Sequence, residues 1–224
     1  MKHIKHDPID YNKWNPDGSG SNIIKLLTPE EIGIWDTALK YQDKGDDPGH
    51  AECVTYFALR FLDYTKAERA IVIPAAMLHD AGWGLMTKEE LDSFRGSLVN
   101  PDIERRLRLK HEEQGSIFAE RLLHEIRYPQ RYIKPICEIV DGHDTRKGFL
   151  SAEDGFVRDA DKLWRYTLMH LKIYGGVPGA PTSKEDLARL IKKPGFFYSE
   201  AVREIARIEL EHTFKVHAVA GNGE

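Results

Sequence analysis

Six ionisable residues stand where a helical sequence would place core residues. They are His50, His79, Asp80, His111, His143 and Asp161. His50, for example, is followed by Val54 and Phe57 at steps of four and three, and His143 follows Ile139 by four. Because residues three or four apart share one face of a helix, we expect each of these side chains to point toward the core.

These six side chains have the composition of a metal site. Burying two carboxylates and four imidazoles costs on the order of several kcal/mol unless a partner compensates them. A divalent metal ion is such a partner, because neutral imidazole and carboxylate are its natural ligands. A lone histidine on an apolar face is usually a satisfied core residue, and a lone buried aspartate is more often a cap or half of an ion pair. Six such residues together favour a metal site. Their spacings of 29, 31, 32 and 18 residues suit ligands carried by successive helices of a bundle.

The order of these residues resembles the HD-domain superfamily, whose signature is a histidine, an adjacent His-Asp pair and a later aspartate on an all-α core. In this chain these are His50, His79, Asp80 and Asp161. The segment DADKL, residues 159–163, is similar to the closing motif of that family, in which the aspartate just before Lys/Arg-Leu is the ligand. Asp161 is therefore preferred to Asp159. The resemblance covers about residues 50–170.

The resemblance also implies how many ions bind. In the superfamily, two further histidines between the His-Asp pair and the last aspartate mark members that hold two metals. By this resemblance His50, His79, Asp80 and Asp161 hold the first ion, and His111 and His143 hold the second, with Asp80 bridging. The metal, whether iron, manganese, nickel, cobalt or zinc, is left open. Two alternatives are also left open. In one, a single ion binds and His111 and His143 bind substrate; in the other, His111 is a surface residue in the charged run of residues 105–115.

The function implied by the resemblance is a metal-dependent phosphohydrolase acting on a nucleotide or small phosphate ester through a metal-bridged hydroxide. Two divalent ions and two aspartates would leave the site with a net charge of about +2, which favours a phosphate and lowers the pKa of a bridging water. Arg146 and Lys147 follow His143 by three and four residues and are the candidate substrate-binding residues. A solvated pair in a loop explains them equally well. Arg108 and Lys110 are expected to be surface charge.

Two other functions fit the same residues. A small branch of the superfamily uses an equivalent ligand set for oxygen chemistry, so a mixed-valent di-iron oxygenase is the first alternative. A metal-bearing module that senses a nucleotide without turning it over is the second. Some mononuclear members carry a catalytic glutamate three residues after the aspartate of the His-Asp pair, and this chain departs from that pattern with Trp83.

Composition restricts the partners. The 224 residues suit one compact domain, and a formal charge of −4 argues against general binding to extended nucleic acid, which leaves a small phosphate substrate as the expected partner. The apolar segment Ile71–Leu78 is too short for a membrane span and contains a proline. The N-terminus lacks the apolar region of a secretory signal, and two cysteines are too few for a disulfide framework. The expected location is therefore cytoplasmic. The oligomeric state is left open.

Helix signals extend along the chain and predict an all-α bundle of roughly seven helices. Capping signals stand at Thr28 with Glu31, Thr87 with Glu90, Asn100 before Pro101, Ser151 with Asp154, and Thr182 with Glu185. Residues 1–22 are polar and predict an extended leader rather than a packed element. Residues 23–175 are expected to form the HD-type helical core, and residues 176–224 a C-terminal helical appendage packed on it.

Overall fold

The computed structural model describes residues 6–11, 13–14, 21–42, 48–96, 100–177 and 179–220. These residues contain ten α-helices and no strand, which confirms the all-α prediction. The α-helices are α1 (Pro29–Gln42), α2 (His50–Phe61), α3 (Arg69–Leu78), α4 (Lys88–Gly96), α5 (Pro101–Glu125), α6 (Gln130–Val140), α7 (Ala152–Leu163), α8 (Leu168–Tyr174), α9 (Lys184–Lys192) and α10 (Glu200–Ala220). The sequence predicted only roughly seven helices. It misses the shortest ones, because a segment such as the seven-residue α8 has too few turns to show a helical period of apolar residues.

Most of the predicted caps are present. Thr28 and Glu31 form a reciprocal box, in which the Glu31 N–H donates to Thr28 Oγ1 at 3.2 Å and the Thr28 N–H donates to Glu31 Oε2 at 2.8 Å. One predicted cap is wrong by one residue. The cap of α9 is Ser183, whose Oγ accepts the Asp186 N–H at 3.0 Å, because the Ser-x-x-Asp pair begins one residue after Thr182.

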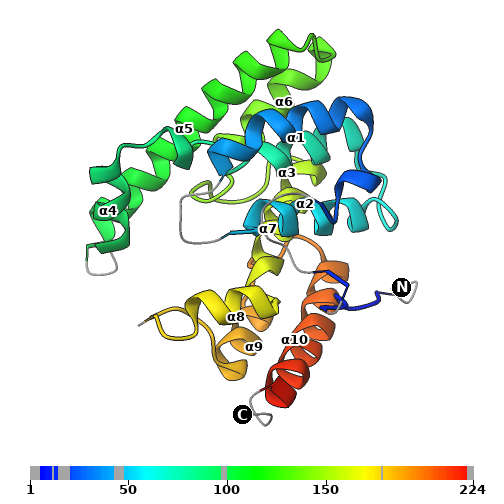
Figure 1. The fold of residues 1–224 in the computed structure, drawn as a ribbon, viewed down its shortest axis with the longest axis vertical. Coiled ribbons are helices and arrows are strands. Elements are labelled where there is room, and N and C mark those ends of the chain that lie inside the picture. The colour runs from blue at the N-terminus through cyan, green and yellow to red at the C-terminus, as the bar shows by residue number, and fades with distance from the viewer. Residues whose placement is uncertain are drawn as a thin grey trace.

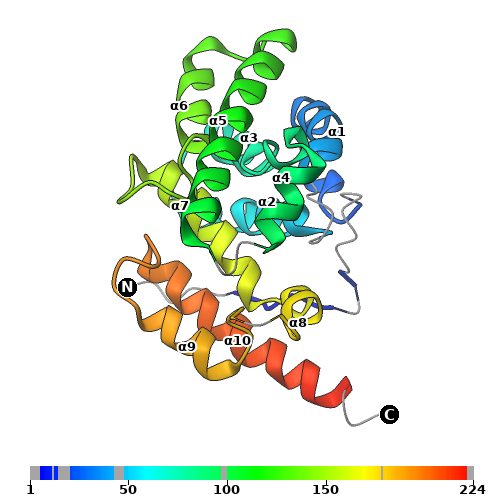
Figure 2. The same cartoon turned by 90° about the vertical axis from the view of Figure 1, so that its left-hand side faces the viewer.

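The apolar helix α3 lies at the centre of the bundle. It packs against α1, α2, α6 and α7, while α5 packs along α6 (Figures 1 and 2). Its residues from Val72 to Leu78 are all buried, as expected of a helix that is apolar on every side. No helix in the described ranges has both the length and the apolar character needed to cross a bilayer.

Helices α8, α9 and α10 lie together at one end of the molecule (Figures 1 and 2). Buried residues of α9 and α10, such as Ile191 and Ile205, belong to the same apolar cluster as the bundle core. The domain division at residue 175 stays a prediction.

The described part of the predicted leader contains no helix, but it is packed, and it includes a turn in which the Lys13 and Trp14 N–H groups both donate to the Asp10 carbonyl oxygen at 2.9 Å. Ile9 is 1% exposed, and its N–H donates to Glu209 Oε1 on α10 at 3.3 Å. His6 Nε2 lies 2.6 Å from the same oxygen, and Tyr11 Oη bonds Thr213 Oγ1 at 2.9 Å. The buried residues Ile9 and Trp14 are isolated apolar residues in a polar segment, too weak a signal to predict this contact.

Candidate metal centre

The six candidate ligands come from five parts of the bundle. Three lie on helices: His50 at the start of α2, His111 within α5 and Asp161 within α7. The other three lie at or just beyond helix ends, since His79 caps α3, Asp80 follows it, and α6 ends at Val140 before His143. His143 was expected to continue the α6 stripe and instead lies in the turn after the helix, where its ring still faces inward.

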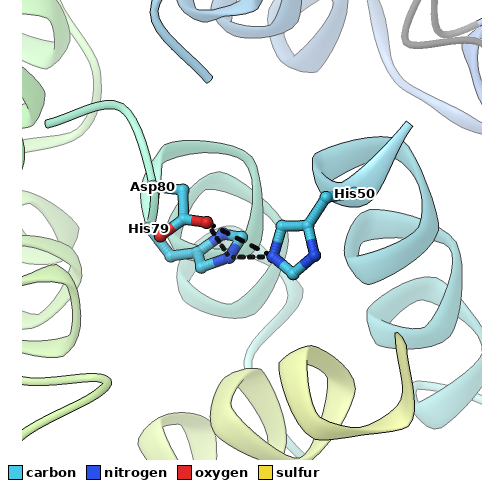
Figure 3. Close-up of side chains that lie close together, drawn as sticks. All are labelled: His50, His79 and Asp80. Carbon is cyan, nitrogen blue, oxygen red and sulfur yellow. Dashed lines mark hydrogen bonds and ion pairs between the residues drawn. The ribbon is translucent and has the colours of Figure 1, made fainter. Parts of the chain in front are cut away.

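The first group of donors consists of His50, His79 and one oxygen of Asp80 (Figure 3). The Nε2 atoms of the two histidines are 3.1 Å apart. Asp80 Oδ2 lies 3.3 Å from His50 Nε2 and 3.5 Å from His79 Nε2. Asp161 Oδ1 is 3.4 Å from His50 Nε2. The structure therefore brings together all four residues predicted for the first ion.

The second group uses the other oxygen of Asp80. The Nε2 atoms of His111 and His143 are 3.4 Å apart, and Asp80 Oδ1 lies 3.5 Å from the first and 3.3 Å from the second. His111 is fully buried, so the surface position considered for it is wrong. The carboxylate of Asp80 thus stands between two histidine pairs, with one oxygen toward each.

The histidine tautomers fit a cation. His79 Nδ1 is 2.8 Å from the Ala76 carbonyl oxygen, and His143 Nδ1 is 3.0 Å from the Val140 carbonyl oxygen. A carbonyl can only accept, so each Nδ1 carries the hydrogen, and the Nε2 of the neutral ring presents a lone pair to the site. Each of these lone pairs faces the Nε2 of another histidine, an arrangement that a positive ion stabilises. Both groups could hold a metal ion.

Charges across the site shift its pKa values. Burial opposes ionisation of Asp161, but its bond to His50 and the nearby Arg165 hold its pKa well below the usual range. Burial lowers the pKa of His79 by more than Asp80 raises it. Burial also disfavours the charged form of His143, yet the carboxylates of Asp80 and Asp144 raise its pKa to about 10. The raised pKa of His143 therefore opposes loss of the proton that metal binding must displace.

Trp83 and Gly82 position the shared carboxylate against α5. The Trp83 indole stacks on His111, with ring centroids 4.1 Å apart, and its Nε1–H donates to Asp80 Oδ1 at 3.1 Å. A Cβ on Gly82 would lie 1.8 Å from the His111 carbonyl oxygen, so only glycine permits this approach. Trp83 therefore orients the shared carboxylate of Asp80.

Sequence reasoning missed an ion pair beside the second group. Arg108 was expected to be surface charge, but its Nη1 lies 2.5 Å from Asp144 Oδ2, which is itself 3.8 Å from His111 Nε2. Burial would raise the pKa of Asp144, yet Arg108 and His143 lower it to about 2. One signal was present in the sequence, since Asp144 directly follows His143 and makes a second His-Asp pair.

Glu112, the neighbour of His111, was also missed. It is buried, and its Oε1 accepts the backbone N–H groups of Asp144 and Thr145, both at 2.8 Å. Its Oε2 accepts the Thr145 hydroxyl at 2.6 Å. Glu112 therefore holds the turn that carries His143.

The predicted substrate-binding residues, Arg146 and Lys147, follow His143 in the chain. The Arg146 guanidinium, however, is hydrogen-bonded to backbone carbonyl groups. Its Nη2 donates to the carbonyl oxygen of Glu138 at 2.6 Å and to that of Asp141. Lys147 is exposed. A role for either residue in binding substrate stays a prediction.

The preference for Asp161 over Asp159 agrees with the geometry. Although the two lie on the same helix, the Asp159 carboxylate accepts the N–H groups of Tyr198 and Ser199, at 2.8 and 2.9 Å, just before α10 begins. Asp161 faces His50 instead.

Comparison of the chain with protein-family models, with curated proteins and with solved structures found no match. Membership of the HD-domain superfamily therefore remains a resemblance in residue order. The structure itself defines a helical protein with a buried histidine and aspartate cluster that is compatible with a metal site.

Proposed function

We propose that this protein is a metal-dependent phosphohydrolase acting on a nucleotide or a small phosphate ester. One observation carries the proposal: the two oxygens of Asp80 face different histidine pairs, at 3.3–3.5 Å. A carboxylate shared in this way suits two ions about 3.5–4 Å apart, which is the spacing used by many phosphate-hydrolysing enzymes.

The proposed ligands of the first ion are His50, His79, Asp80 and Asp161, and those of the second are His111, His143 and Asp80. When bound, such ions polarise a phosphate ester and lower the pKa of a coordinated water. The protein's own contribution is orientation. The carbonyls of Ala76 and Val140 fix the ring nitrogens of two histidines, and the Trp83 N–H fixes the bridging carboxylate.

Two arginines supply positive charge at the borders of the cluster. Arg165 Nη1 lies 3.9 Å from Asp161 Oδ2, and Arg108 lies against Asp144 on the other side. Their side chains are 31% and 32% exposed, so both reach solvent as well as the cluster. Guanidinium groups bind phosphate oxygens strongly, and this placement supports an anionic substrate better than Arg146 does.

The proposal is tested with protein purified without oxygen. Its metal content is measured, and release of phosphate is assayed with a panel of phosphomonoesters, phosphodiesters and nucleotides under added manganese, cobalt or nickel. We expect close to two ions per chain and hydrolysis that disappears in Asp80→Ala.

Three other results would contradict the proposal. Two irons with oxygen uptake and no phosphate release would indicate the oxygenase. Nucleotide binding without turnover would indicate a sensor. A chain that binds no metal would exclude all of these functions.

A further inference from the structure

The two donor groups have matching surroundings. Asp161 stands beside the first group, 3.4 Å from His50 Nε2, and Asp144 stands beside the second, 3.8 Å from His111 Nε2. Each of these carboxylates also faces an arginine: Arg165 at 3.9 Å and Arg108 at 2.5 Å, respectively. The first group therefore has a carboxylate of its own in addition to Asp80, and the second has one at a similar position.

We propose that Asp144 is a ligand of the second metal ion, and that Arg108 occupies this carboxylate only while the ion is absent. The inference rests on the proposed function, since it requires a second ion. Each ion would then have two histidines, one aspartate of its own and one oxygen of Asp80.

The distance between Asp144 and His111 permits this ligation. Two donors that each lie about 2.1 Å from one ion are at most about 4.2 Å apart. The 3.8 Å between Asp144 Oδ2 and His111 Nε2 lies within that limit. Glu112 holds the backbone of residues 144 and 145, so the proposed exchange is a rotation of the Asp144 side chain, from Arg108 to the ion, on a fixed backbone.

Charge also favours the exchange. Without Asp144, the second ion would be balanced only by its share of Asp80. A divalent ion attracts a carboxylate more strongly than a guanidinium does, so it competes with Arg108 for Asp144. Arg108 does not lose all its partners, because its Nε also donates to Glu104 Oε1 at 3.0 Å.

The competing explanation is an ion pair that only ties α5 to the turn after α6. The two explanations differ when Arg108 alone is replaced. Loss of a structural tie would weaken the second ion in Arg108→Gln as well as in Asp144→Asn, whereas loss of a ligand weakens it only when Asp144 is replaced.

The test titrates the metal-free full-length protein with Co²⁺ in a calorimeter and counts cobalt per chain after dialysis. The variants are Asp144→Asn, Arg108→Gln and the double variant, with far-UV circular dichroism as a check of folding. Glu104→Gln is the matched control, because it removes the other carboxylate of Arg108 and leaves Asp144 in place.

We expect the unaltered chain to bind two ions. Asp144→Asn and the double variant should bind the first ion normally and the second at least about 10-fold more weakly. Arg108→Gln and Glu104→Gln should bind the second ion no more weakly than the unaltered chain.

An unchanged second ion in Asp144→Asn, an equal weakening in Arg108→Gln, or full recovery in the double variant would overturn the role of Asp144 while leaving the proposed function standing. Fewer than two ions in the unaltered chain would overturn both.

Discussion

The two halves of the candidate metal centre are held by different forces. The half containing His50 and His79 depends more on packing, with the His50 and Trp164 ring centroids 5.3 Å apart, because its flanking ion pair of Arg165 with Asp161 is long, at 3.9 Å. In the other half, His143 lies on a turn that the buried Glu112 holds by hydrogen bonds and that Arg108 holds by an ion pair.

This difference indicates which half of the metal centre is more easily disrupted by a substitution. Apolar packing is spread over many contacts, so one substitution removes only part of it. A buried polar network depends on each partner, because a group left alone bears its full desolvation cost. The second half should therefore be lost through changes to residues that are not ligands, whereas the first half should tolerate such changes better.

The largest effect is expected where the halves meet. Asp80→Ala removes the carboxylate that faces both histidine pairs, so both ions should be lost, with affinities reduced by more than about 100-fold. Metal per chain, measured by mass spectrometry, checks this. Asp159→Asn is the control, since its carboxylate faces the start of α10 and its metal content should not change. Full metal occupancy in Asp80→Ala would contradict the shared carboxylate.

The backbone contact between the halves should be nearly as sensitive. Gly82→Ala places a Cβ 1.8 Å from the His111 carbonyl oxygen, so the turn must move away from α5. We expect unfolding free energy to fall by about 3 kcal/mol in chemical denaturation. Gly33→Ala, in open space on α1, should instead raise it by about 0.5–1 kcal/mol. Equal effects of the two would show that the contact is not tight.

Glu112→Gln tests the polar support of the second half alone. An amide offers one acceptor oxygen where Glu112 uses two, so the turn carrying His143 should loosen. Binding of the second ion should weaken about 10-fold, and binding of the first should stay unchanged, as measured by calorimetry. Glu113→Gln changes the exposed neighbour and should alter neither ion. If both ions weaken together, the halves are not independently supported.

The smallest effect concerns the packing behind the first half. His170 is buried near Trp164, and burial lowers its pKa from the usual 6.5 to about 4. Its folded-state pKa is depressed, so its stabilising contribution is fully present above pH 6.5 and is lost as the pH falls toward 4. We expect this effect of His170 to lower the unfolding free energy by about 1 kcal/mol between pH 7 and pH 5.5.

His170→Phe should remove that loss while preserving aromatic packing. The check is the difference in unfolding free energy between variant and unaltered chain at the two pH values. His124→Gln, which changes an exposed histidine, should leave the pH dependence as it is. An unchanged slope in His170→Phe would place the pH dependence elsewhere.

The sequence predicts what depends on short-range periodicity. The all-α class, most caps and the inward direction of His50 and His111 follow from spacings of three and four and from local side-chain bonds. The turn after α6 was missed although Gly142, with a φ of +131°, follows the helix end at Val140 by two residues, because the steps Ile136, Ile139 and His143 continue the helical spacing across it. Arg108 could not be placed either, since its charged surroundings in sequence resemble a surface helix until α5 meets the turn.

The contacts of the N-terminal segment affect the order in which the molecule can fold. His6 and Ile9 bond Glu209, about 200 positions later in the chain. During synthesis on the ribosome, this segment emerges early and must wait until α10 is made before it can dock. Closing so long a loop is slow, so docking of the two is expected to be a late step in folding, after the central bundle has formed.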